Sequence, residues 1–284
     1  MALVILAALC VAAFAVIFRF FERYDVALFP AIAINYAVAF ACGLMLHPPW
    51  SVGDISLLWM PSAVLGVLFV SIFSLQGLSS QRAGAARTTI AGRMSLVITV
   101  LGIVFLFHER IATLSIIGIA IALIGLLLTT TSGTADGDKR SWMLPLLIFL
   151  GCGAADVIVN AAQRVRTTSL NEAAFTTMCF GGASTLSAIV LAIRGPRAAL
   201  SHRGTWIGGL VLGIVNYASL LFLVLALGEG ALPASSIFPL MNIAAILFAT
   251  IAGITLFKER LSVRQWIGIA CCITALVVIM LSPA

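Results

Sequence analysis

The sequence predicts an all-α integral membrane protein with ten transmembrane helices, arranged as two inverted five-helix repeats. Composition is the first observation: 62% of the 284 residues are hydrophobic and only 9% are charged. Soluble domains carry roughly 45–50% apolar and about 25% charged residues. The second observation is that apolar stretches recur along the whole chain, and the third is a motif that occurs in both of its halves.

The apolar stretches have the length of membrane spans, because a helix needs about 20 mainly apolar residues to cross the hydrocarbon core. The predicted spans are residues 2–18, 26–46, 55–76, 87–107, 113–131, 142–162, 172–193, 205–227, 231–257 and 263–281. The connections between them are too short for a soluble domain. The first span is not expected to be a signal peptide, because Arg19 and Arg23 follow its apolar run instead of preceding it.

Basic residues are unevenly distributed over the predicted loops. Most lysines and arginines, Arg82 and Arg87 among them, fall after the first, third, fifth, seventh and ninth spans. The positive-inside rule places these loops in the cytoplasm, so both termini are predicted outside. The net charge of +6 then reflects orientation in a lipid bilayer, and no nucleic acid partner is expected.

An internal repeat divides the chain. Residues 107–110 read Phe-His-Glu-Arg and residues 257–260 read Phe-Lys-Glu-Arg, and Ile-Gly-Ile-Ala follows in both places, at 117–120 and 267–270. The predicted repeats are residues 1–131 and 142–284, joined by a short linker at 132–141. Because each contains an odd number of spans, the second enters the membrane inverted, an arrangement typical of secondary transporters.

The paired Phe-x-Glu-Arg motifs, each followed by an apolar helix with Gly118 or Gly268, resemble the EamA-type carriers of the drug/metabolite transporter superfamily. The resemblance covers essentially the full chain. It implies a carrier of a bacterial-type plasma (inner) membrane that exports amino acids, other metabolites or drugs, or exchanges nucleotide sugars or organic phosphates. Two features depart from the family: Pro239 has no proline counterpart in the fourth span, and the loop at residues 47–54 has no lysine or arginine.

Arg93 is the first candidate site residue, because an ionisable group within a span costs about 2.5–3.5 kcal/mol on insertion scales and commonly marks a functional site. A guanidinium there suits a carboxylate or phosphate of a substrate. Two alternatives are a structural pair with a carboxylate or with helix-end carbonyls, and snorkelling of the side chain to the interface.

Asp156 is the second candidate, and Asn160 and Gln163 follow it on one helical face as a polar stripe. A desolvated carboxyl group suits proton coupling. If Asp156 instead meets Arg93, the two form a gate latch. Asp156 and Asn160, together with Pro239 of the ninth span, are therefore predicted to serve coupling or gating.

The ninth span and two Asn–Tyr pairs supply the remaining candidates. Ser235, Pro239 and Asn242 share one face of the ninth span, where a proline kink frees a backbone carbonyl. A packed kink with Asn242 bridging helices is the alternative. Two pairs, Asn216-Tyr217 and Asn35-Tyr36, either hydrogen-bond a polar substrate or join helices.

These patterns predict a transporter and not an enzyme. The histidines have no metal spacing, and neither a Walker sequence nor a Gly-x-Ser-x-Gly elbow occurs, so no metal and no cofactor are expected. The leading hypothesis is a secondary carrier, exporter or exchanger, of a small polar metabolite such as an amino acid or organic anion, working by alternating access as a monomer or homodimer. Its site would lie among the fourth, sixth, eighth and ninth spans. The alternative is a flippase-like lipid-handling protein or a non-transporting membrane scaffold.

Overall fold

The computed structural model describes residues 1–52, 59–107, 113–130, 143–164, 172–194, 200, 202–228 and 234–281, and this part of the chain contains helices but no β-strand. The helices are α1 (Ala2–Arg23), α2 (Leu28–Leu46), η1 (Pro49–Val52), α3 (Trp59–Ala83), α4 (Ala85–Met94), α5 (Leu96–Phe107), α6 (Thr113–Thr130), α7 (Met143–Arg164), α8 (Glu172–Arg194), α10 (Arg203–Gly228), α11 (Ala234–Phe257) and α12 (Val263–Met280).

Seven of the helices in the described part are long and apolar enough to cross a membrane: α1, α2, α3, α8, α10, α11 and α12. Helices α6 and α7 contain shorter apolar stretches. The prediction of an all-helical protein with membrane-spanning helices is therefore confirmed. The ten spans and the inverted repeat remain predictions, although a helix occupies each of the ten predicted segments.

The predicted loop between the third and fourth spans is wrong. Helix α3 continues to Ala83 and α4 begins at Ala85, so Gly84 alone makes the turn. Its φ of 98° and ψ of 158° lie in a region that is essentially restricted to glycine. Arg82 is consequently helical, and Arg87 is buried within α4.

The fourth predicted span is not one helix. It divides at Ser95 into α4 and α5, and the Ser95 hydroxyl donates to the Gly92 carbonyl oxygen at 2.7 Å. A serine that bonds its own helix backbone in this way competes with the regular helical pattern. The division places a polar break between Arg93 and the remainder of the span.

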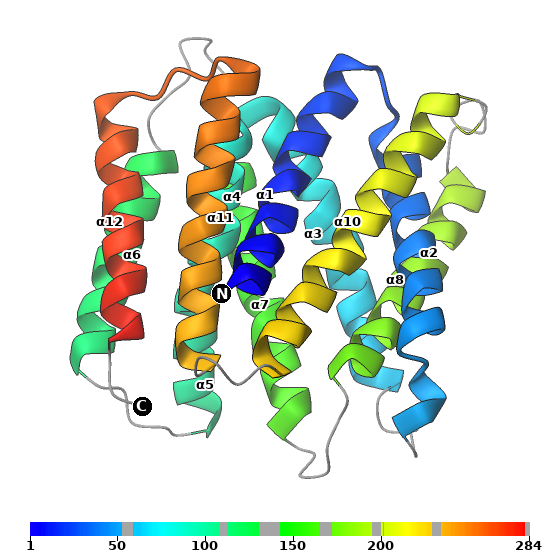
Figure 1. Ribbon diagram of the computed structural model, residues 1–284, viewed down its shortest axis with the longest axis horizontal. Helices are drawn as coiled ribbons and strands as arrows, with labels where there is room; N and C mark the ends of the chain where they lie inside the picture. Colours follow the sequence, from blue (N-terminus) through cyan, green and yellow to red (C-terminus); the bar gives the residue numbers. More distant parts are fainter. Residues whose placement is uncertain are drawn as a thin grey trace.

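Helices α6 and α12 pack closely at one edge of the molecule, the left edge in Figure 1. Their contact is reciprocal: a Cβ added at Gly125 would lie 2.9 Å from the Gly268 carbonyl oxygen, and one at Gly268 would lie 2.9 Å from that of Gly125. A Cβ at Gly118 would lie 3.3 Å from the Ala275 carbonyl oxygen. The early residues of α6 thus meet the late residues of α12, so the two helices are antiparallel.

Two more pairs of helices are antiparallel by the same reasoning. In α2 and α8, a Cβ at Gly43 would touch Thr177 and one at Gly181 would touch Phe40. In α4 and α11, Arg93 contacts Asn242, while the start of α4 contacts the residues that follow α11. Between these pairs, α1 packs on α10 and α11, and α7 packs on α3, α4 and α5 (Figure 1).

Candidate functional site

A cavity of about 230 Å³ lies in the middle of the helical bundle. Its wall is formed by α1, α2, α3 and α4 from the first half of the chain and by α8, α10 and α11 from the second. Most of the wall is apolar. The polar side chains among the described lining residues are Tyr36, Arg93, Thr176, Asn216 and Ser219. The cavity therefore combines one guanidinium with a few hydrogen-bonding groups on an apolar surface.

Aromatic rings from four helices make up much of this wall. Phe14, Tyr36, Phe69, Phe73 and Phe180 all line the cavity. Successive ring centroids lie 5.3 Å apart for Phe14 and Phe73, 5.6 Å for Tyr36 and Phe73, and 6.2 Å for Tyr36 and Phe180. Tilted rings at 4.5–7 Å are a favoured aromatic packing. The wall thus presents a continuous aromatic surface to whatever occupies the cavity.

Arg93 lies where the two halves of the chain meet. Its side chain is half-buried and lines the main cavity as well as a smaller one, of about 20 Å³, between α1, α3 and α4. One guanidinium nitrogen, Nη1, donates to Oδ1 of Asn242 at 3.5 Å. The structure thus brings two predicted site residues together, and Asn242 holds the arginine toward α11.

Asp156 approaches the same region from α7. Its Oδ2 atom accepts hydrogen bonds from the hydroxyl groups of Ser95 and Thr99, each at 3.3 Å. Both donors lie at the break between α4 and α5, two and six residues beyond Arg93. The break in the fourth span therefore connects the two predicted ionisable residues.

The two Asn–Tyr pairs separate in the structure. Asn216 lines the cavity and its Nδ2 donates to Oδ1 of the fully buried Asn35 at 3.2 Å, so this contact joins α10 to α2. Tyr217 points elsewhere, and its hydroxyl lies 2.7 Å from Nδ1 of His47 at the end of α2. Of these four residues, Asn216 and Tyr36 are the ones that reach the cavity wall.

Three predicted residues are described only by their backbone. Asn160 lies in α7, and Ser235 and Pro239 lie in α11, while their side chains fall outside the described part of the structure. The aromatic wall was missed by the sequence prediction. Phe14 with Phe18 and Phe69 with Phe73 share helical faces, but no spacing within one helix relates rings that come from different helices.

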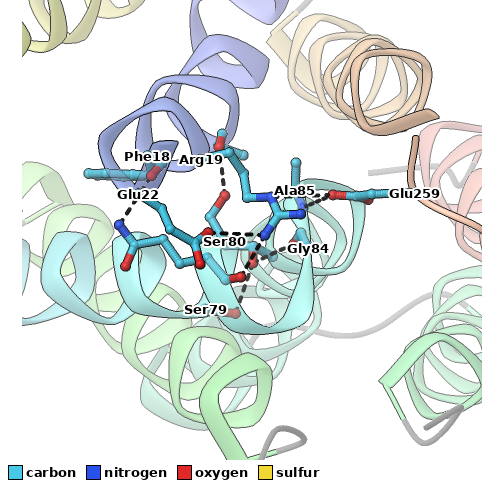
Figure 2. Close-up of polar contacts among 11 residues, drawn as sticks. Phe18, Arg19, Glu22, Ser79, Ser80, Gly84, Ala85 and Glu259 are labelled. Carbon is cyan, nitrogen blue, oxygen red and sulfur yellow. Dashed lines mark hydrogen bonds and ion pairs between the residues drawn. The ribbon is translucent and has the colours of Figure 1, made fainter. Parts of the chain in front are cut away.

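A separate polar cluster joins α4 to the turn after α11, as Figure 2 shows. Oε1 of Glu259 accepts a hydrogen bond from the backbone N–H of Ala85 at 2.9 Å and lies 4.0 Å from Nε of Arg19. The Glu259 side chain is only 13% exposed. A carboxylate is stabilised at the start of a helix, where backbone N–H groups are unpaired and the helix dipole is positive.

Arg19 extends this cluster to α1 and α3 (Figure 2). Its Nη1 donates to the Gln81 carbonyl oxygen at 2.6 Å and to Oε2 of Glu22 at 3.2 Å. Close by, the Ser80 hydroxyl donates to the Ala15 carbonyl oxygen at 2.6 Å. Polar contacts therefore join α1, α3, α4 and the end of α11 at this end of the bundle.

The structure shows apolar helices of membrane-spanning length around a cavity, and comparison with known proteins identifies the class of protein. Residues 141–281 match the model of the EamA-like transporter family. This segment of the chain belongs to the family, which is part of the drug/metabolite transporter superfamily. The recognition made from the paired motifs is therefore confirmed.

Two further similarities extend over the whole chain. An uncharacterized protein of Haemophilus influenzae is 27% identical over 282 residues, which cover 96% of this chain and 95% of the relative. The crystal structure of a protein with 18% sequence identity matches with a TM-score of 0.60 and covers 97% of this chain and 98% of the solved one. The second similarity shows that both halves share a fold with a solved structure.

Proposed function

We propose that this transporter is a secondary carrier, an exporter or exchanger, that moves a small metabolite with an anionic group by alternating access. The observation that carries this proposal is the central cavity with Arg93 in its wall. A guanidinium in an apolar surrounding binds a carboxylate or phosphate through two parallel hydrogen bonds. A volume of about 230 Å³ suits a compact metabolite, because drug-sized pockets are usually about 300–1,000 Å³.

The packing of the helices supports two inverted repeats, residues 1–131 and 142–284. If α1 corresponds to α7, α2 to α8, α3 to α10, α4 and α5 to α11, and α6 to α12, exchanging the halves maps the main contacts onto one another. The pair α2–α10 becomes α8–α3, and α1–α10 becomes α7–α3. Corresponding helices also pack antiparallel, as a two-fold axis in the membrane plane requires.

One set of helix contacts is not reproduced when the two halves are interchanged, and this asymmetry supports alternating access. Helix α1 packs on α3 and α4, but no comparable packing of α7 on α10 or α11 occurs in the described part of the chain. We infer a conformation that is closed at the end where Arg19 and Glu259 lie. The basic residues of the loops at this end make it the cytoplasmic end, with both termini outside. The relative from a bacterium agrees with a location in the inner membrane.

The side chains have distinct proposed roles. Arg93 binds the anionic group, and Asn242 orients Arg93. Asn216 offers a hydrogen bond to the substrate, and Asn35 positions the Asn216 side chain by accepting its other hydrogen bond. Asp156 carries a coupling proton or latches a gate against Arg93, and its contacts with the α4–α5 break suit either role. Asn160, Ser235 and Pro239 retain the roles predicted from the sequence. For Tyr217, whose hydroxyl lies 2.7 Å from Nδ1 of His47, we infer the alternative role of joining helices.

Metabolite profiling tests the proposal. Cells expressing wild type, Arg93→Ala or the control Arg82→Ala are compared at matched membrane levels; Arg82 is exposed near the end of α3. We expect one anionic metabolite to shift between cells and medium with wild type and Arg82→Ala, but not with Arg93→Ala. Normal transport by well-expressed Arg93→Ala would overturn the role of Arg93. A shift only among membrane lipids would support the flippase-like alternative instead.

A further inference from the structure

Tyr36 has a hydroxyl group that the described structure leaves without a partner. The side chain is fully buried, and its oxygen makes no hydrogen bond among the described residues. Buried polar groups are almost always hydrogen-bonded, because an unsatisfied one loses its interactions with water and gains nothing in return. A phenylalanine would fill this place between Phe73 and Phe180 without that cost, so the hydroxyl calls for an explanation.

The position of Tyr36 suggests the explanation. The residue lies in the wall of the central cavity together with Arg93, and aromatic rings occupy much of the wall around it. Its ring packs at 5.6 Å from Phe73 and 6.2 Å from Phe180, which fixes the plane of the phenol. A ligand in the cavity therefore lies beside a guanidinium and a flat apolar surface, in a wall that also contains the unpartnered phenol of Tyr36.

Resting on the carrier function proposed above, we propose that the substrate is an anion built on a flat, ring-containing body, and that Tyr36 selects a second hydrogen-bonding group on that body. Arg93 binds the anionic group. The rings of Phe14, Phe73 and Phe180 contact the body of the substrate by offset or edge packing, which aromatic groups favour. A phenol both donates and accepts, so a hydroxyl or an amine on the substrate satisfies it.

This assignment differs from the small polar metabolite that the sequence favours. A polar body would lose its water against the apolar wall and find few partners there, since Thr176, Asn216 and Ser219 are the other polar residues in the described part of the lining. An apolar ring loses no hydrogen bonds in the same place. The wall thus selects for the ring, and Tyr36 selects among rings with different substituents.

Binding to the purified full-length protein in lipid nanodiscs tests this inference. The probes are phenylacetate, its 2-, 3- and 4-hydroxy derivatives, and glutarate as an anion without a ring, each titrated by calorimetry. For wild type, we expect phenylacetate to bind about tenfold more tightly than glutarate. We expect one hydroxy isomer to bind roughly 3- to 10-fold more tightly than phenylacetate, the gain typical of one net hydrogen bond.

The Tyr36→Phe variant should bind phenylacetate at least as well as wild type and lose the preference for the hydroxy isomer. The matched control is Tyr217→Phe, which removes a hydroxyl that contacts His47 and should keep the preference. An isomer preference that survives in Tyr36→Phe would overturn the role of Tyr36. Equal binding of glutarate and phenylacetate would overturn the inference that the substrate contains a ring.

The two levels of the proposal fail differently. If glutarate binds as tightly as phenylacetate and Arg93→Ala abolishes the binding of both, the ring-selective inference falls while an anion carrier stands. If both probes bind wild type and Arg93→Ala equally, the anion site itself is wrong. Loss of the isomer preference in Tyr36→Phe, together with loss of all binding in Arg93→Ala, supports both.

Discussion

The carboxylate of Glu259 accepts a hydrogen bond from the backbone N–H of Ala85 at 2.9 Å, although 174 residues separate them in the chain. The contact joins the turn after α11 to the first residue of α4, two helices that correspond in the proposed repeat. Arg19 adds α1 to the same cluster. One carboxylate therefore stands where the two halves of the transporter meet at the closed end.

Removal of this carboxylate should open the closed end. In Glu259→Ala, Ala85 loses its acceptor and Arg19 loses one of its two anionic partners, whereas Glu259→Gln keeps an acceptor oxygen without the charge. In a cysteine-free background with Ser219→Cys on the cavity wall, we expect faster labelling of Glu259→Ala by a membrane-impermeant maleimide added from this end. Glu259→Gln should fall between it and the parent.

The control for this experiment is Glu22→Ala. Glu22 is 56% exposed and pairs with the same arginine, and exposed ion pairs contribute only about 0–1 kcal/mol. Its labelling rate should stay close to that of the parent. A Glu259→Ala protein that labels no faster than its parent from this end would show that the cluster does not act as a gate.

Substitution of Arg93 by lysine should weaken substrate binding without unfolding the protein. Lysine keeps the positive charge but cannot make the two parallel hydrogen bonds of a guanidinium with a carboxylate or phosphate. In proteoliposomes, we expect KM for the transported anion to rise about tenfold, equivalent to about 1.4 kcal/mol of binding. Arg82→Lys serves as the control, and an unchanged KM in Arg93→Lys would argue against a two-point contact.

The sequence predicted helix positions well because apolar runs of span length leave little alternative in a membrane. It missed the direct α3–α4 turn, since Gly84 makes the reversal without the polar linker that usually marks a loop. Arg93, Asn216 and Asn242 stood out as polar residues within apolar segments. The structure places all three at or beside the cavity.

The remainder of the site depends on which helix faces meet, and one helix alone does not reveal this. Asn216 and Tyr217 are adjacent in sequence, yet one lines the cavity and the other contacts His47. The aromatic wall was invisible for the same reason, because a phenylalanine that faces lipid and one that faces a cavity look alike in an apolar segment. The significance of Tyr36 likewise comes from the fold, because its hydroxyl lacks a partner in the described structure.

A side chain at Gly125 should weaken the close contact between α6 and α12. A Cβ there would lie 2.9 Å from the Gly268 carbonyl oxygen and 3.0 Å from the Cys272 backbone nitrogen, so the helices must separate. We expect Gly125→Ala to destabilise the protein by about 1–3 kcal/mol, as overpacking typically does. Thermal unfolding in detergent measures the effect.

Gly92→Ala provides the matched control for that substitution. An added Cβ at Gly92 has its nearest neighbour 3.7 Å away, at Nε2 of Gln76, which is ordinary contact. Because alanine favours the helix over glycine by about 0.5–1 kcal/mol, Gly92→Ala should leave stability unchanged or raise it. Equal stability of the two variants would mean that α6 and α12 are not in close contact.

Neutralising Asp156 separates its two proposed roles. Asn at this position still offers an oxygen to the hydroxyls of Ser95 and Thr99, so the break between α4 and α5 should persist, but the side chain can no longer take up a proton. If Asp156 carries the coupling proton, Asp156→Asn proteoliposomes should lose transport driven by a pH gradient and retain substrate exchange, which moves no net proton. Ser95→Ala removes a hydrogen-bond donor and keeps the carboxyl group, so it should retain both activities. Loss of exchange as well in Asp156→Asn would point to a gate latch, and normal pH-driven transport would exclude Asp156 as the proton carrier.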